Sequence, residues 1–278
     1  MRVLVPLLTF PPGDLSDALA PRVAHVARHL SADVHALVLD LIYPLATTPL
    51  SSAVGGVAEL IEATRSQSRD HGSALVATLA RALAESGRRL TSSEVEVPMF
   101  GFADAVGYQA RYHDLTVIPL GNASRDVQAI AEGALFGSGR PALLLPTSRN
   151  APSAFRHGLI AWDGSRAAAR ALADGLGLLE RAESVTIAAV LGEKPLPDEM
   201  MLDRLQSYLE SRNITPAISR IPHRGAAVGQ ALGDHAREIG ADFIVMGGFG
   251  HSRVRDFVLG GATRYMLANA TMPVLLSH

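Results

Sequence analysis

Short apolar runs alternate with longer helical patterns along the whole chain. In the first half the runs lie at residues 3–8, 34–39, 94–97, 115–120 and 142–145, and in the second half at 158–162, 184–191, 217–221, 243–247 and 274–277. Stretches with helical periodicity lie between them, at 17–30, 59–86, 166–180, 198–211, 226–239 and 262–270. Because near-continuous apolar strands that alternate with helices are typical of a parallel sheet covered on both faces, the pattern predicts an α/β fold.

The two halves carry similar segments in the same order. The matching pairs are Val3-Leu-Val-Pro6 with Leu159-Ile-Ala-Trp162, His113-Asp-Leu-Thr-Val-Ile118 with Ala241-Asp-Phe-Ile-Val-Met246, and Pro141-Ala-Leu-Leu-Leu145 with Pro273-Val-Leu-Leu-Ser277. This order indicates a duplicated unit, which we divide into domains at 1–147 and 155–278. Residues 146–152 between them are polar and bounded by proline, as expected of a linker.

Composition narrows the function classes. The 25 basic and 27 acidic residues nearly cancel, which gives no sign of nucleic-acid binding. The chain has no cysteine, so disulfides, cysteine-ligated metals and thiol catalysis are excluded. The longest apolar run is shorter than the roughly 20 residues that a membrane-spanning helix needs.

The N-terminus has some features of a signal peptide, with an apolar run that ends near Phe10 and then Ala18-Leu-Ala20. Asp14, Asp17 and Pro21 around that site argue against cleavage, so we expect a buried first strand instead. The absence of a signal and of cysteine leads us to expect a cytoplasmic protein.

Glycines follow one of the last strands. The segment runs Val245-Met-Gly247-Gly-Phe-Gly250-His-Ser-Arg253-Val-Arg255-Asp-Phe-Val-Leu-Gly260-Gly261-Ala262-Thr263. A glycine pair that opens a helix leaves free N–H groups at the positive end of the helix dipole, which suits an anion. The segment has neither the Gly-Lys-Ser/Thr of a P-loop nor the third glycine of the dinucleotide fingerprint. On its own it also fits a simple turn.

An acidic turn, Asp163-Gly-Ser165, follows the first strand of the second half. Asp163 is suited to cap the next helix, and a carboxylate at that strand end is also suited to accept hydrogen bonds from a base or ribose. Later in the chain, Gly247-x-x-Gly250 is followed by a spacing of nine residues and then Gly260. Together with the acidic turn, this pattern resembles the signature of the universal stress protein family. The resemblance covers 155–278 and, more faintly, 1–147.

The resemblance implies two tandem, doubly wound, open parallel-sheet domains with strand order 3-2-1-4-5, and ATP or another adenine nucleotide, with or without Mg, at the point where the order reverses. It implies that Asp163 lies beside the adenosine, that the backbone of Val190 contacts the adenine edge, and that the ribose and phosphates are lined by Gly247, Gly250, Gly260, Gly261, Ala262 and Thr263. It also implies pairing of domains through their fifth strands, here as a pseudo-dimer within one chain, with a homodimer as a further possibility.

One departure concerns Gly261, where nucleotide-binding members of the family usually carry Ser or Thr. The missing hydroxyl removes a hydrogen bond to phosphate, and this is expected to weaken binding tenfold or more. In the first half Pro119 stands at the place of Gly247, Asn122 at that of Gly250, and Leu7 at that of Asp163. We therefore expect a nucleotide site in the second domain only.

Other candidates have simpler interpretations. His25 and His29 lie one helical turn apart, but nothing nearby completes a metal site, and we expect exposed helix residues. Arg253 and Arg255 are suited either to a solvated loop or to clamping phosphates. Trp162 either fills an interface or stacks on a base.

These observations predict a stress-response regulator or sensor that binds an adenine nucleotide, without a dedicated catalytic site or metal site. The resemblance implies at most a slow enzymatic activity, either ATP hydrolysis or autophosphorylation. Two alternatives stay open. One is an interaction or scaffold protein that needs no nucleotide. The other is a small-ligand binder that uses the Pro- and Ala-rich residues 43–57 of the first domain.

Overall fold

The computed structural model describes residues 1–9, 18–42, 57–98, 101–121, 125–148, 154–192, 200–223, 225–248 and 260–278. The strands are β1 (Arg2–Leu8), β2 (Asp33–Ile42), β3 (Leu90–Pro98), β4 (Leu115–Leu120), β5 (Ala142–Pro146), β6 (His157–Ala161), β7 (Ser184–Leu191), β8 (Ala217–Pro222), β9 (Phe243–Gly247) and β10 (Val274–Ser277). The helices are α1 (Leu19–His29), α2 (Val57–Glu85), α3 (Phe102–Ala110), α4 (Arg125–Glu132), the π-helical turn η1 (Gly133–Gly137), α5 (Arg166–Leu179), α6 (Met201–Glu210), α7 (Val228–Glu238) and α8 (Gly261–Asn269).

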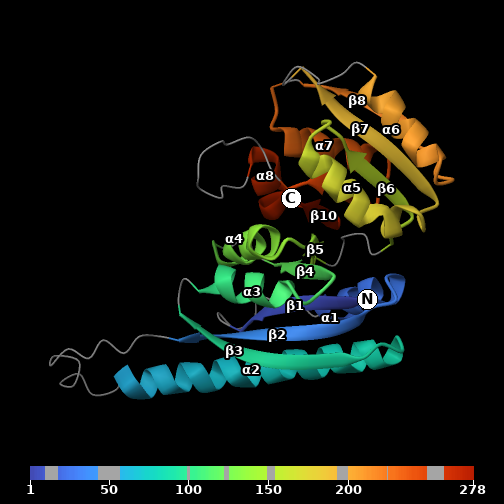
Figure 1. Cartoon of the computed structure of the whole chain (residues 1–278). Helices are drawn as coiled ribbons and strands as arrows, with labels where there is room; N and C mark the ends of the chain where they lie inside the picture. The colour runs from blue at the N-terminus through green and yellow to red at the C-terminus, as the bar shows by residue number, and fades with distance from the viewer. Residues whose placement is uncertain are drawn as a thin grey trace.

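All ten strands form one sheet, in the order β3-β2-β1-β4-β5-β10-β9-β6-β7-β8. Figure 1 shows this order running from β3 and α2 at the bottom to β8 at the top. Each half is parallel within itself and has the predicted order, because β6 to β10 repeat the order of β1 to β5. The α/β prediction is confirmed. The two sheets are continuous through β5 and β10, the fifth strands of the two halves, through which the resemblance implied that they pair.

The junction between the halves is an antiparallel pairing of β5 with β10. It joins Leu144 to Val274, Leu143 to Leu275 and Ala142 to Leu276. These strands are the edges of the two five-stranded sheets, and an unpaired edge would expose a row of backbone N–H and C=O groups. Pairing them within one chain removes both edges.

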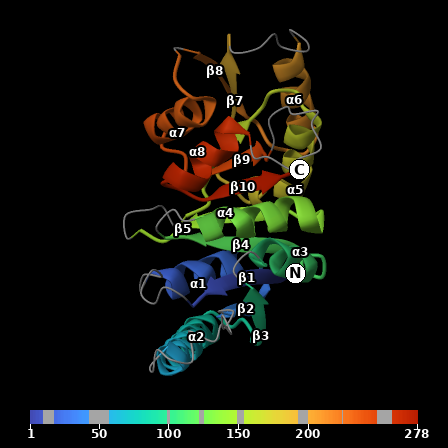
Figure 2. The same ribbon diagram turned by 90° about the vertical axis from the view of Figure 1, so that its left-hand side faces the viewer.

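The hydrophobic core continues across this junction on both faces of the sheet. One cluster contains side chains of α1, α2, α5 and α6, and the other contains side chains of α3, α4, α7 and α8. Neighbouring residues of β5 and β10 alternate between the two clusters, as side chains of a strand must. The view in Figure 2, turned by 90°, shows the two halves stacked directly on each other at this junction.

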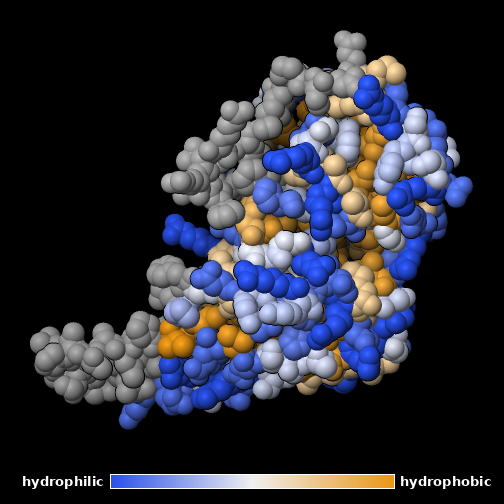
Figure 3. Space-filling model, viewed as in Figure 1, coloured by the Kyte–Doolittle hydropathy of each residue, from blue (hydrophilic) through white to orange (hydrophobic). Residues whose placement is uncertain are grey.

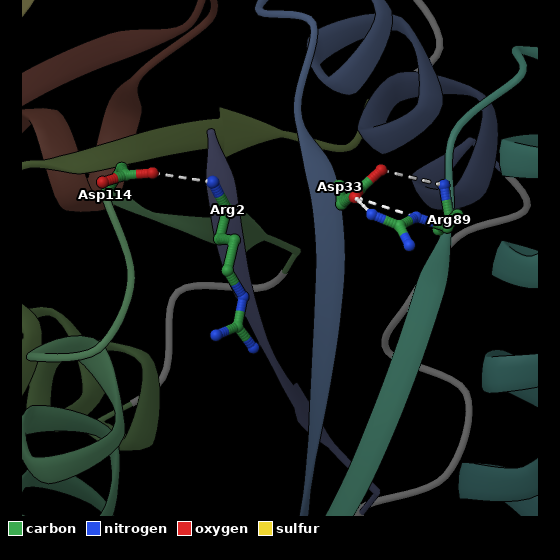
Figure 4. Close-up of polar contacts among 4 residues, drawn as sticks. All are labelled: Arg2, Asp33, Arg89 and Asp114. Carbon is green, nitrogen blue, oxygen red and sulfur yellow. Dashed lines mark hydrogen bonds and ion pairs between the residues drawn. The ribbon is translucent and has the colours of Figure 1, made fainter.

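Matching hydrogen bonds identify the residues that correspond in the two halves. The backbone N–H of Arg2 donates to Asp114 Oδ2 at 2.7 Å (Figure 4). In the second half, the N–H of His157 donates to Asp242 Oδ2 at 2.9 Å. Arg2 therefore corresponds to His157, and counting six residues onward makes Leu8 the counterpart of Asp163. The prediction that Leu7 takes the place of Asp163 was wrong by one residue.

A second polar contact holds the outer strands of the first half. Arg89 donates to Asp33 from its backbone N–H at 3.2 Å and from its guanidinium at 2.7 Å and 3.1 Å (Figure 4). This ion pair lowers the pKa of the Asp33 carboxyl from its ordinary value. Since Asp33 begins β2 and Arg89 precedes β3, the contact fixes the start of both strands.

The two halves also meet at α1. His25 stacks on Phe155, with ring centroids 6.1 Å apart, and His29 packs on the same ring at 5.0 Å. Arg181 donates to the carbonyl of His29 across the same contact. The histidines are half-buried, so the prediction of exposed helix residues was wrong.

Within the described residues, no helix is both long enough and apolar enough to cross a membrane. On the face shown in Figure 3, hydrophobic side chains form separate small areas between hydrophilic ones.

The contact at Phe155 leads to a pH-dependent stability. Burial lowers the pKa of His25 and His29, and nearby cations lower it further: Arg28 and Arg22 for His25, Arg181 and His25 for His29. Because the unfolded chain then binds more protons, the stabilisation is fully present above pH ~6.5 and is lost as the pH falls below it. We expect the variant with His25→Gln and His29→Gln to lose less stability than the wild type between pH 7.5 and 5.5, in urea unfolding followed by circular dichroism.

His35 and His113, whose pKa values burial also lowers, are present in both proteins and cancel in this comparison. An equal loss of stability in the two proteins would show that the Phe155 contact does not respond to pH.

Candidate functional site

A cavity of about 350 Å³ lies in the second half, at the carboxyl ends of β6, β7 and β9. β6 has β7 on one side and β9 on the other, so the chain order reverses between β6 and β9. Ligands of open α/β sheets bind at such a point. The volume is within the range of small-molecule sites, about 300–1,000 Å³.

Asp163 lies in the turn that leads from β6 to α5. Its Oδ1 accepts a hydrogen bond from the Ser165 N–H at 2.9 Å, and Gly164 adopts the left-handed conformation with φ of 72°. Ser165 then caps α5, since its Oγ accepts from the Ala168 N–H at 3.1 Å. The Asp-Gly-Ser sequence thus forms its own turn and leaves Oδ2 of Asp163 without a hydrogen-bond partner among the described residues.

The end of β7 has backbone groups that face the cavity. Pairing of β6 with β7 ends at Ala161 and Ala188, and the Trp162 N–H donates to the Ala188 carbonyl at 2.8 Å. Backbone groups of alternate strand residues point the same way, so the N–H and C=O of Val190 point past the end of β6. A donor and an acceptor side by side match the edge of a base that has a ring nitrogen next to an amine.

The opposite wall is formed by the end of β9 and the start of α8. Gly260 caps α8 in an extended conformation, and no side chain caps the helix, so N–H groups of its first turn are available to an anion. Thr263 lines the same wall and is only 1% exposed.

Gly247 has a structural reason to be glycine. A Cβ there would lie 2.8 Å from the Ala168 backbone nitrogen and 3.0 Å from the Ala167 Cβ, so α5 could not pack against the end of β9. At Gly261, by contrast, a Cβ would meet no atom within 4 Å. Glycine at 261 is therefore not required by packing.

The structure brings together most of the residues predicted from the sequence. Those that line the cavity are Asp163, Val190, Gly247, Gly260, Gly261, Ala262 and Thr263. Gly250, Arg253 and Arg255 lie outside the described residues, as do residues 43–56, most of the segment considered for a ligand of the first half.

Sequence reasoning missed part of the lining. His223, which follows β8, and Val228, which opens α7, both line the cavity. Trp162, for which the sequence left stacking on a base open, lines the cavity too, and its buried indole nitrogen has no hydrogen-bond partner among the described residues. The signal that pointed to them was available: each follows the end of a strand or begins a helix at the same edge of the sheet.

In the first half, the backbone carbonyl that corresponds to that of Val190 already accepts a hydrogen bond. Strand register makes Leu39 the counterpart of Val190, and β1 pairs with β2 as far as Leu8 and Leu39. The Thr9 hydroxyl then donates to the Leu39 carbonyl at 3.1 Å. Where the second half has a partly buried Val228 at the start of α7, the first has Phe102 at the start of α3, which is 5% exposed.

Two prolines add to this difference. Pro6 corresponds to Ala161 and Pro119 to Gly247, and neither has an N–H to donate. Pairing of β1 with β4 covers only two residue pairs, whereas β6 pairs with β9 over four.

Comparison with known proteins gives a family match for the part of the chain that holds the cavity. Residues 154–278 match the sequence model of the universal stress protein family. Comparison with curated protein sequences gives no match.

Solved structures similar to the whole chain include a universal stress protein from Archaeoglobus fulgidus, with 15% identity and a TM-score of 0.70 over 99% of this chain and 97% of that chain. A putative universal stress protein from Pseudomonas aeruginosa matches with 14% identity and a TM-score of 0.61, over 99% and 92%. At these identities the likeness shows the fold.

A third match is a universal stress protein in complex with cAMP, with 20% identity and a TM-score of 0.32, over 44% of this chain and 97% of that chain. At that TM-score, the bound cAMP describes that protein alone and says nothing about the ligand of this chain.

Proposed function

We propose that residues 154–278, which match the sequence model of the universal stress protein family, bind an adenine nucleotide, and that the protein is a regulator or sensor in a stress response. The observation that carries the proposal is the cavity at the reversal of strand order, whose lining includes Asp163, Val190 and the start of α8. The proposal treats 155–278 as the binding domain and 1–147 as its partner domain.

The base would lie against the end of β7. The open N–H and C=O of Val190 are suited to adenine N1 and the exocyclic amine, and Trp162 and the apolar residues around it cover the faces of the ring. The free oxygen of Asp163 is suited to accept from a ribose hydroxyl.

The phosphates would lie at the start of α8. N–H groups of its first turn and the helix dipole stabilise negative charge there without a lysine. Of the described residues that line the cavity, Asp163 alone has a carboxylate, and its free oxygen is assigned to the ribose, so a Mg ion carried by ATP would keep its phosphate and water ligands.

The first half would contribute structure rather than a second site. The Leu39 carbonyl, which corresponds to the open carbonyl of Val190, already accepts a hydrogen bond from Thr9. The buried Phe102 begins α3, as the cavity-lining Val228 begins α7. Its paired strand β5 keeps β10, and through it β9, in place beneath the cavity.

Two observations favour a second candidate, an interaction protein that needs no nucleotide. Gly247 is explained by its packing on α5, so this glycine is no evidence for a ligand. Gly261 also lacks the hydroxyl expected near phosphate. The binding experiments below separate the two candidates.

Replacing Asp163 tests the proposed ribose contact. We expect Asp163→Ala and Asp163→Asn each to weaken ATP binding about tenfold or more in titration calorimetry, because a hydrogen bond to a charged acceptor is worth about 1.5–3 kcal/mol. The asparagine keeps an oxygen for the Ser165 N–H, so its loss of affinity would not come from a broken turn. Asp203→Ala, at an exposed position on α6, is the control and should bind as the wild type does. Equal affinities in all four proteins would reject the assigned cavity.

Replacing Gly261 tests the phosphate end. A serine side chain fits there, because a Cβ meets no atom within 4 Å. We expect Gly261→Ser to strengthen ATP binding about tenfold or more, since a hydrogen bond to a charged group such as phosphate is worth about 1.5–3 kcal/mol. Gly261→Ala fits equally well but adds no hydroxyl, so it serves as the matched control. If alanine and serine change the affinity alike, the phosphates do not lie at this position.

A further inference from the structure

His223 lies beside the part of the cavity assigned to the base. It follows β8, and its backbone N–H donates to the Leu191 carbonyl at 2.8 Å, one residue beyond Val190. Its side chain is half-buried and lines the cavity. The His223 side chain therefore lines the same cavity as Val190, whose backbone groups would meet the base edge.

The hydrogen bond of the ring assigns its proton. Nε2 lies 2.9 Å from the Ala226 carbonyl oxygen. A carbonyl oxygen only accepts, so Nε2 must carry the hydrogen. In the neutral imidazole Nδ1 then has a lone pair, and it has no hydrogen-bond partner among the described residues.

We propose that His223 selects a 6-aminopurine over a 6-oxopurine, through Nδ1 as a hydrogen-bond acceptor. This inference rests on the proposed function, since it concerns the base in the same cavity. The exocyclic amine of adenine has two hydrogens, of which one would go to the Val190 carbonyl and the other to Nδ1. A 6-oxo base would bring an oxygen against two acceptors, and a buried site built to hydrogen-bond an amine rejects the analogue that lacks it.

AMP and IMP are the probes, because they differ only in the 6-amino or 6-oxo group and the ring proton that goes with it. Trp162 is the only tryptophan of the chain and lines the cavity, so its fluorescence reports binding of either nucleotide. We expect the wild type to bind AMP at least tenfold more tightly than IMP. The Val190 backbone contributes to this preference, so the contribution of His223 is measured by variants.

Two variants separate the functions of the two ring nitrogens. An asparagine oxygen reaches about as far along the side chain as Nδ1, and a glutamine amide nitrogen about as far as Nε2. We expect His223→Asn to keep the preference for AMP, with weaker binding of both nucleotides because the bond to Ala226 is lost. We expect His223→Gln to keep that bond and to lower the ratio of AMP to IMP affinity about tenfold.

The outcomes are distinguishable, with circular dichroism to show that both variants are folded. If the wild type binds neither nucleotide, the proposed function fails and this inference with it. If the wild type prefers AMP but His223→Gln leaves the ratio unchanged, only the inference about His223 is overturned. If both variants weaken AMP and IMP by the same factor, His223 holds the turn at Ala226 and does not read the base.

Discussion

The antiparallel pairing of β5 with β10 is the contact on which the rest of the molecule depends. Each half alone would end in a short apolar edge strand with unpaired backbone groups, and such a strand is prone to pair with strands of other chains. Three residue pairs instead join the edges and let both hydrophobic clusters run across the whole molecule. Because the pairing is antiparallel, the carboxyl ends of the strands in one half point opposite to those in the other half. The two points of reversed strand order therefore lie at opposite ends of the strands.

The two halves then differ in one backbone detail with large consequences. In the first half β1 runs on beside β2, and the Thr9 hydroxyl takes the next carbonyl, that of Leu39. In the second half β6 stops after Ala161 and turns into Asp163, which leaves the corresponding carbonyl of Val190 facing a cavity. A polar backbone group without a protein partner in a partly enclosed place needs water or a ligand. The same fold thus supports one closed and one open strand end.

Much of this was predictable from the sequence, for identifiable reasons. Period and composition predict the ten strands, because most of them are nearly continuous apolar runs, and they predict six of the helices. The stretches named as helical did not include α3 and α4. Seven of the predicted lining residues do meet at the cavity, since the carboxyl ends of parallel strands share one edge.

What the sequence could not predict depends on contacts between distant segments. The packing reason for Gly247 lies in α5, some 80 residues earlier in the chain, and nothing around Gly247 indicates it. The register of the first half was misplaced by one residue, because only the bonds of Asp114 and Asp242 show which residues correspond. His25 and His29 looked exposed, because Phe155, which covers them, follows more than a hundred residues later.

The central claim is that one half of this duplicated chain has an open nucleotide site and the other a closed one. The stoichiometry of adenine-nucleotide binding, measured by equilibrium dialysis of the full chain against ATP, tests it most directly. The account predicts one ATP per chain at saturation. Two per chain would contradict the closure of the first half by Thr9 and Phe102, and none at millimolar ATP would contradict the assignment of the cavity itself.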